Sequence, residues 1–144
     1  MRQERHVGYE IKALSNLLRR KVLESAGTND GDEFTEMQVK VLGFLAHNQD
    51  QEICQKDIEE AFYIRRSTAS RLLKRLEAQG FISRQAVERD ARLKRVTTTP
   101  KSDALCQQVM ERIDSVENQL IRGISQAEVE QFLSTVEKLK QNLM

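Results

Sequence analysis

The sequence predicts a mainly α-helical fold with one small β-hairpin. Two observations support this prediction: apolar residues recur at steps of three or four along most of the 144-residue chain, and a β-branched stretch precedes Pro100. The composition agrees, because one Pro and six Gly among 31% charged residues are typical of a helix-rich globular protein. A chain of this length is expected to form a single domain.

The N-terminal part is predicted to hold two helices separated by a polar loop. Apolar residues at helical spacing mark a helix from Val7 to Gly27, and the polar, acidic stretch Ser25 to Glu33 indicates a loop. Thr35 and Gln38 have the T-x-x-Q form of a capping box, in which the hydroxyl accepts a backbone N–H and the amide returns to the cap. A second helix is therefore expected from this cap to about His47.

Two short helices in quick succession are predicted next. Apolar residues at helical spacing mark the first, from Gln55 to Phe62. After a brief break around Tyr63 and Ile64, the second begins near Arg66 and ends at Gly80. This arrangement is typical of a helix-turn-helix.

A β-hairpin follows the helix-turn-helix. The run Phe81 to Arg84 begins an extended segment, a polar tip is expected over Val87 to Ala91, and the β-branched content of Arg92 to Thr99 indicates the returning strand.

Two long helices complete the chain. Pro100 suits the first position of a helix with Thr99 as its cap, and Ser125 with Glu128 forms another capping box. The apolar seams of these helices are Leu105, Val109, Ile113, Val116 and Leu120, then Val129, Phe132, Leu133, Val136, Leu139 and Leu143. A core of about 65 residues is too small to cover these seams and that of the first helix, so a homodimer is expected. Mutual burial within a monomer is the alternative.

Several classes of protein are not indicated. The charged N-terminus MRQERHVGYE is followed by no apolar signal segment, and no window approaches the roughly 18 apolar residues of a membrane span, so a cytoplasmic protein is expected. Cys54 and Cys106 form no C-x-x-C pair, and His6 and His47 lack metal-ligand spacing. No metal or cofactor is expected, and no enzyme, because Gly-rich phosphate loops and nucleophile motifs do not occur.

The charge is concentrated in one segment. The whole chain carries only +1, but Ala61 to Lys101 contains eleven basic and three acidic residues, a net +8, which leaves −7 for the remainder. A local positive field suits a polyanion, although many charge runs only solvate a surface.

The second helix of the helix-turn-helix separates an apolar from a basic face. At about 100° per residue, one side gathers Ala69, Leu72, Leu73 and Leu76. The opposite side carries Ser67, Arg71, Lys74 and Ala78, with Ser70 and Arg75 on the flanks. Small hydroxyls allow close approach, and Arg and Lys reach phosphates or guanine edges, so this face is expected to enter the DNA major groove.

The hairpin tip forms a second basic group. Arg89 and Arg92 flank Asp90, and Lys94 and Arg95 follow on the returning strand. An Arg at such a tip can enter the narrow minor groove while the carboxylate orients it, whereas the alternative is a flexible turn with incidental charges.

These residues resemble a known family. The run STASRLLKRLEAQGFISR from Ser67 to Arg84, followed by Asp90-Ala91-Arg92, is similar to the MarR family of winged helix-turn-helix transcriptional regulators. Thr35-x-x-Gln38-x-x-Val41-Leu42 also resembles the second helix of that family. Two positions depart from the family pattern: Thr98 stands where Leu is usual, and Ser102 where Gly is common.

The resemblance implies a single domain over residues 1–144, with a winged helix-turn-helix core at about 35–99 and dimerisation helices at about 6–27 and 100–143. A homodimer would read a pseudo-palindromic operator in double-stranded DNA, most simply as a repressor, and a small phenolic or lipophilic effector would release it. The expected DNA contacts are Arg65, Arg66, Ser67, Thr68, Ser70, Arg71, Lys74, Arg75, Arg89, Asp90, Arg92 and Lys94. Two alternatives remain open: a winged helix that binds protein, and a redox sensor that uses Cys54 near a helix N-terminus.

Overall fold

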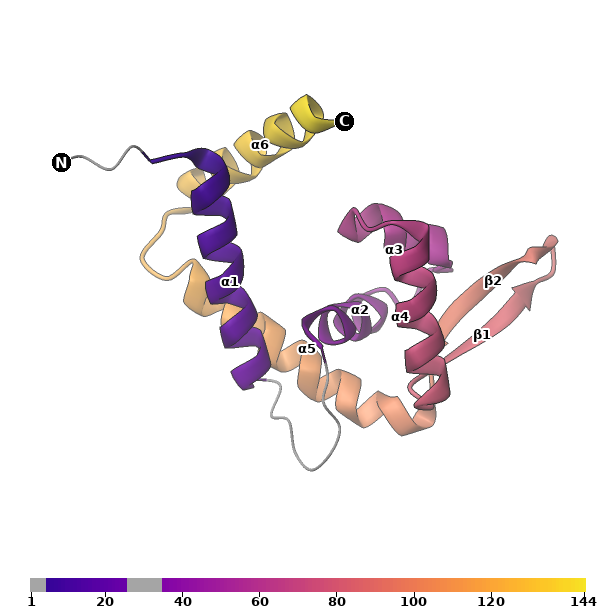
Figure 1. The fold of residues 1–144 in the computed structure, drawn as a ribbon. Helices are drawn as coiled ribbons and strands as arrows, with labels where there is room; N and C mark the ends of the chain where they lie inside the picture. Colours follow the sequence, from indigo (N-terminus) through magenta and orange to yellow (C-terminus); the bar gives the residue numbers. More distant parts are fainter. Residues whose placement is uncertain (1–4, 26–34) are drawn as a thin grey trace.

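The computed structural model describes residues 5–25 and 35–144, and in this part of the chain it contains six helices and one antiparallel two-stranded sheet (Figure 1). The elements are α1 (Val7–Ser25), α2 (Glu36–His47), α3 (Gln55–Phe62), α4 (Arg66–Ala78), β1 (Ile82–Val87), β2 (Asp90–Thr98), α5 (Pro100–Leu120) and α6 (Gln126–Leu143). Their order confirms the predicted one. The predicted loop after Ser25 lies almost entirely outside the described residues, as does the predicted end of the first helix at Gly27. No helix in the described ranges is long and apolar enough to cross a membrane.

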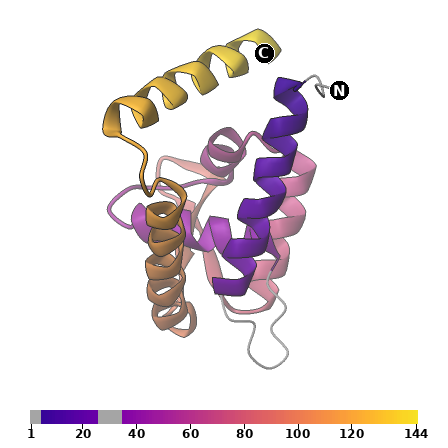
Figure 2. The same ribbon diagram turned by 90° about the vertical axis from the view of Figure 1, so that its left-hand side faces the viewer.

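The elements form two groups that α5 connects. In Figure 1, α2, α3, α4 and the hairpin lie together, and α5 runs from the base of the hairpin toward α1. Figure 2 shows α6 apart from the hairpin and from the lower part of α5. No α6 residue is buried, and Lys140 places its Nζ 4.9 Å from the ring centroid of Tyr63.

The core of the helix-turn-helix consists of side chains from α2, α3 and α4. Leu42, Ile58, Leu73 and Leu76 are fully buried there. Each such aliphatic side chain contributes about 1.5–3 kcal/mol relative to an exposed one. This common core fixes α4 against α2 and α3 and leaves its other face exposed.

The turn between α3 and α4 depends on one left-handed residue. Tyr63 has φ 52° and ψ 44°, a conformation that few non-glycine residues adopt. Its neighbour Ile64 donates its N–H to the Glu59 carbonyl at 3.1 Å. The break predicted at Tyr63 and Ile64 is thus confirmed as a tight reversal between two short helices.

The hairpin is longer and its turn shorter than predicted. The tip was expected over Val87 to Ala91, but β1 extends to Val87 and β2 begins at Asp90, so the turn contains only Glu88 and Arg89. Ala86 pairs with Lys94 while Val87 pairs with Asp90, a register shift that leaves residues 91–93 without a partner in β1. Backbone pairing extends past the β-branched residues because it needs no particular side chain.

The hairpin is tied to the core by the segment before α3. Val96 donates its N–H to the Ile53 carbonyl at 2.7 Å, and a bridge joins Cys54 to Arg95. Val96 and Ile53 are both buried. The base of the wing is therefore fixed by backbone hydrogen bonds and by apolar packing.

The start of α5 explains one departure from the family pattern. Ser102 is fully buried, and its Oγ lies 2.9 Å from the Thr99 N and 3.0 Å from the Thr99 O. Thr99 in turn donates its hydroxyl to the Gly80 carbonyl at 2.6 Å. The predicted cap at Thr99 is confirmed, and Ser102 completes it where a glycine could not.

The seam of α5 is covered mainly by its own chain. Val109 and Val116 are buried in a second cluster with Val22 of α1 and Val39 of α2. A Cβ on Gly43 would lie 2.6 Å from Ile113 Cδ1, so the glycine allows α2 and α5 to cross closely. Within the chain, α1 and α2 thus cover the middle of the α5 seam, whereas Leu120 at its end is 38% exposed.

Candidate nucleic-acid interface

The recognition helix α4 has the two faces predicted from its sequence. Ala69, Leu73 and Leu76 are fully buried, and Leu72 is half-buried. The opposite side is exposed at Ser67, Arg71, Lys74, Arg75 and Ala78, with Thr68 and Ser70 half-buried beside it. A helix that is packed on one face and basic on the other can enter a groove without losing its core contacts.

The N-terminus of α4 extends the basic surface. Arg65 is the N-cap residue and Arg66 the first residue of the helix, and both side chains are exposed. The unpaired backbone N–H groups of the first turn and the positive end of the helix dipole point in the same direction. This end of α4 therefore favours a phosphate group.

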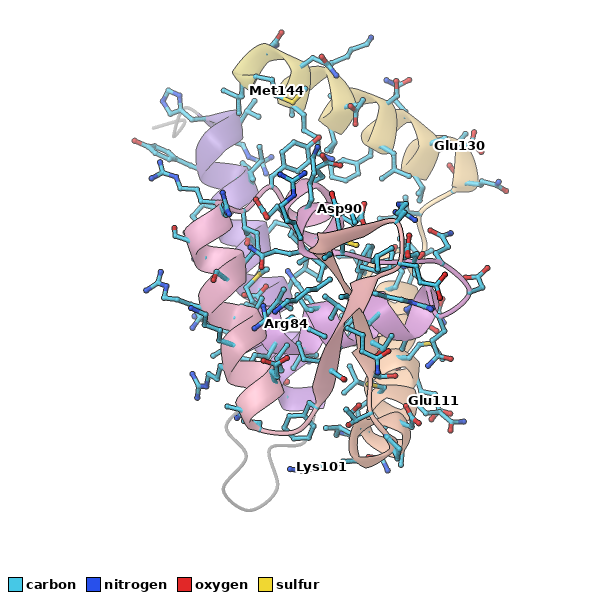
Figure 3. All side chains as sticks on the ribbon, turned by 90° about the vertical axis from the view of Figure 1, so that its right-hand side faces the viewer. Arg84, Asp90, Lys101, Glu111, Glu130 and Met144 are labelled. Atoms are coloured by element: carbon cyan, nitrogen blue, oxygen red, sulfur yellow. The ribbon has the colours of Figure 1, made fainter. Side chains whose placement is uncertain are left out.

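Arg84 is held by an acid on the recognition helix. Its guanidinium donates through Nε to Glu77 Oε2 at 3.2 Å and through Nη2 to Glu77 Oε1 at 3.1 Å, and Figure 3 labels Arg84 between α4 and the hairpin. The Arg84 side chain is only 17% exposed. These hydrogen bonds and the charge of Arg84 lower the pKa of Glu77 below its ordinary value.

The two arginines of the wing tip also contact acids. Arg89 lies 2.6 Å from Glu52 Oε2, and Arg92 Nε lies 3.4 Å from Asp90 Oδ1. Asp90 Oδ1 also accepts the Arg92 backbone N–H at 2.9 Å, which holds the chain in a tight turn. The Arg92 side chain is 92% exposed and extends from the tip into solvent.

Eight cations of the basic segment have no acidic partner within 4 Å in the described residues. They are Arg65, Arg66, Arg71, Lys74, Arg75, Lys94, Arg95 and Lys101. Of these, Lys101 is held at the base of the wing, because its Nζ contacts the Gln79 carbonyl and the Phe81 ring. Arg95 was not among the expected contacts, although its position next to the buried Val96 indicates an outward side chain.

The environment of Cys54 does not stabilise a thiolate. Burial raises the pKa of its thiol, and the carboxylates of Asp57 and Glu52 raise it further. Asp57 accepts the Cys54 backbone N–H at 2.8 Å, so a negative charge already lies at this helix N-terminus. Burial also raises the pKa of Cys106, which lies in the core. Within the described ranges, no cluster of three His, Cys, Asp or Glu side chains could hold a metal ion.

Comparison with known proteins gives consistent matches. The MarR family model matches residues 33–93. The transcription regulator MarR from Oenococcus oeni PSU-1 is 26% identical, with a TM-score of 0.85 over 94% of this chain and 99% of that chain. MepR of S. aureus in its DNA-binding conformation is also 26% identical, with a TM-score of 0.85 over 97% and 100%. The S. aureus MepR–DNA complex is 26% identical, with a TM-score of 0.81 over 98% and 100%.

The helix-turn-helix, the hairpin beside it and the basic face of α4 define a winged helix-turn-helix protein. Residues 33–93 match the MarR family model, and nearly the whole chain is similar in structure to MarR-family regulators. Its fold is that of the MarR-family transcription regulators, and the family and these structural neighbours are regulators and not enzymes.

Proposed function

We propose that this protein is a sequence-specific regulator that binds double-stranded DNA as a homodimer and represses transcription by occupying a pseudo-palindromic operator. The observation that carries the proposal is the exposed face of α4, on which Arg71, Lys74 and Arg75 have no acidic partner among the described residues. The related MepR, at 26% identity, has been solved in complex with DNA.

The two groups of cations have different roles in this proposal. Arg71 lies in the middle of the exposed face of α4, where a bidentate contact with a guanine edge is feasible. Arg92 leaves the wing tip, where it would enter the minor groove with Asp90 as its orienting acid. The remaining expected contacts would bind phosphates and fix the register.

The homodimer is supported by apolar surface on α1 and α6. Tyr9 is 76% and Leu17 58% exposed, although both lie in a helix whose C-terminal part is packed. On α6, Phe132 and Leu133 are 56% and 59% exposed. Apolar patches of this kind on a soluble protein mark association surfaces, so we propose residues 6–27 and 100–143 as the dimerisation helices of a single domain.

Release by a small apolar effector belongs to the same proposal. The structure has an apolar hollow of about 220 Å³ between α1 and α5, lined among others by Leu14, Leu17 and Val116. A phenolic or lipophilic molecule bound there would act where the dimerisation helices meet. Titration of the DNA complex with salicylate tests this part, and unchanged binding at saturating salicylate argues against a phenolic effector.

The DNA-binding proposal is tested by selecting duplexes from a random pool and measuring their affinity by fluorescence anisotropy. The double variant Arg71→Ala/Arg92→Ala is expected to lose most of the selective binding, since it removes one contact from each groove. Lys138→Ala on α6 is the control, because its side chain is exposed and distant in sequence from the basic segment. Equal binding by the double variant and the parent would exclude the proposed interface and favour a winged helix that binds protein.

A further inference from the structure

We infer that the Glu77–Arg84 ion pair is a positioning device that holds the wing at a fixed angle to the recognition helix. The inference rests on the proposed DNA binding and concerns residues that would not contact DNA themselves. Glu77 lies in the last turn of α4 and Arg84 in β1, so the pair joins the two parts that would enter different grooves.

The geometry of this pair differs from that of an ordinary surface ion pair. Two nitrogens of the Arg84 guanidinium each donate to a different carboxylate oxygen of Glu77, at 3.1 and 3.2 Å. A bidentate fork fixes orientation as well as distance, which a single contact does not. The side chain of Arg84 is also largely covered, which restricts its alternative rotamers.

Arg84 marks the end of the part of β1 that packs on the core. Ile82 is fully packed in the core, whereas Gln85 and Ala86, beyond Arg84, are exposed. On β2, Ala91 to Arg95 are likewise exposed. Beyond the pairing of Arg84 with the buried Val96, residues 85–86 of β1 and 91–95 of β2 have no buried side chain. The pair with Glu77 therefore supports the wing against α4 at the point where core packing ends, while Arg89 joins the tip to Glu52.

The sign of the charge makes the inference testable. Glu77 is an acid on a helix that is otherwise basic on its exposed side, and a carboxylate near DNA repels phosphates. If Glu77 acted only through its charge, its removal would strengthen DNA binding. If it positions the wing, its removal weakens binding.

The experiment compares Glu77→Gln with Glu88→Gln, using a duplex that the parent protein selects from a random pool. Glu88 is an exposed acid of the wing turn with no basic partner within 4 Å in the described residues, so its removal reports the electrostatic effect alone. We expect Glu77→Gln to bind about fivefold more weakly than the parent, and Glu88→Gln to bind as tightly or more tightly. Arg84→Lys keeps the charge but not the fork and is expected to weaken binding to a similar extent.

A second readout separates positioning from loss of folded protein. Hydroxyl-radical protection of the minor groove should weaken in Glu77→Gln, while protection of guanine N7 in the major groove persists at saturating protein. Thermal unfolding by circular dichroism confirms that both variants are folded. Glu77→Gln binding at least as tightly as the parent, or protections in both grooves falling together, would overturn the inference. Failure of the parent to select any duplex would instead overturn the proposed function.

Discussion

The contact between Gly43 and Ile113 shows how one missing Cβ determines a helix crossing. In a helix an alanine is normally favoured over glycine by about 0.5–1 kcal/mol. At position 43, however, a Cβ would lie 2.6 Å from Ile113 Cδ1. The helix interior of α2 therefore contains a residue of poor helix propensity because α5 occupies the space of its side chain.

This contact predicts opposite effects for two glycine substitutions. Gly43→Ala is expected to lower the free energy of unfolding by about 1 kcal/mol, because the end of the Ile113 side chain must shift within the packed contact between α2 and α5. Gly8→Ala in α1 is the matched control, since nothing lies within 4 Å of its added Cβ, and it should be neutral or slightly stabilising. Urea unfolding at one fixed protein concentration measures both, and equal stability of the two variants contradicts the prediction.

The pair between Glu77 and Arg84 predicts a pH dependence of defined sign. The pKa of Glu77 is lowered in the folded state, chiefly by hydrogen bonds from Arg84, so the folded protein binds the proton less readily than the unfolded chain. The pair therefore stabilises the fold above the ordinary pKa of a glutamate, and this contribution is lost as the pH falls through the lowered value. Because the side chain of Glu77 is 42% exposed, solvent screening limits the contribution to less than about 1 kcal/mol.

Comparison of the parent with Glu77→Gln in urea checks this sign. The difference in free energy of unfolding is expected at neutral pH and should vanish in acid. A difference that grows as the pH falls would show that the carboxylate is not stabilised by Arg84.

The environment of Cys54 predicts a thiol that reacts slowly with hydrogen peroxide. Its raised pKa leaves a smaller thiolate fraction at neutral pH than a free cysteine has, and the thiolate is the species that peroxide oxidises. We therefore expect hydrogen peroxide at moderate concentration to leave DNA binding unchanged, and Cys54→Ser to behave like the parent. Peroxide-induced release that Cys54→Ser abolishes would instead support the redox-sensing alternative.

At the scale of elements, caps, faces and the local pair of Asp90 with Arg92 were predictable, whereas the partner of Arg84 on α4 was not. The capping boxes at Thr35 and Ser125 confirm their predictions, because a cap depends on residues only three positions apart. Glu77 and Arg84 are separated by a chain reversal at Gly80, with φ 78°, so their pairing depends on the angle between α4 and β1. The sequence showed a basic segment, but not that Glu77 and Glu52 bind two of its cations, Arg84 and Arg89.

Substitutions in the recognition helix and in the wing are expected to weaken DNA binding in different ways. Arg71→Ala should weaken binding by about 1–3 kcal/mol and relax specificity at one base step, because it removes a base contact from α4. Lys94→Ala should weaken binding uniformly over all sequences and reduce the salt slope by about one, as expected for a phosphate contact. Anisotropy titrations on single-mismatch duplexes at several salt concentrations distinguish them, and identical profiles for the two variants contradict the assignment.

For the whole molecule, the near-neutral net charge of +1 conceals a division of roles. The basic segment lies on α4 and the wing, whereas the exposed apolar surface lies on α1 and α6. The sequence predicted this division but not which part of the α5 seam its own chain covers, because seam periodicity does not reveal which chain covers a seam. In the structure α1 and α2 cover the middle of the seam and leave Leu120 exposed.

The proposed dimer predicts that one added charge on α6 weakens DNA binding, although α6 lies outside the proposed DNA-binding surface. Leu133→Asp places a carboxylate in the exposed apolar surface and should shift sedimentation from a dimer to the 16.6 kDa monomer at micromolar concentration. Affinity for the selected duplex should then fall, since one half-site no longer assists the other. Lys138→Ala is the control, and a parent protein that itself sediments at 16.6 kDa refutes the dimer.

The hydrogen bond from Thr99 to the Gly80 carbonyl limits how the wing can be exchanged between relatives. It connects Gly80, the second residue after α4, to Thr99, the residue before α5, and Ser102 completes the cap on the other side of Thr99. A chimera that replaces only residues 82–98 would join a foreign hairpin to the recipient's own Gly80, Thr99 and Ser102. A graft that carries residues 80–102 transfers the junction intact, so the smallest interchangeable unit of this fold is the wing together with the first turn of the helix that follows it.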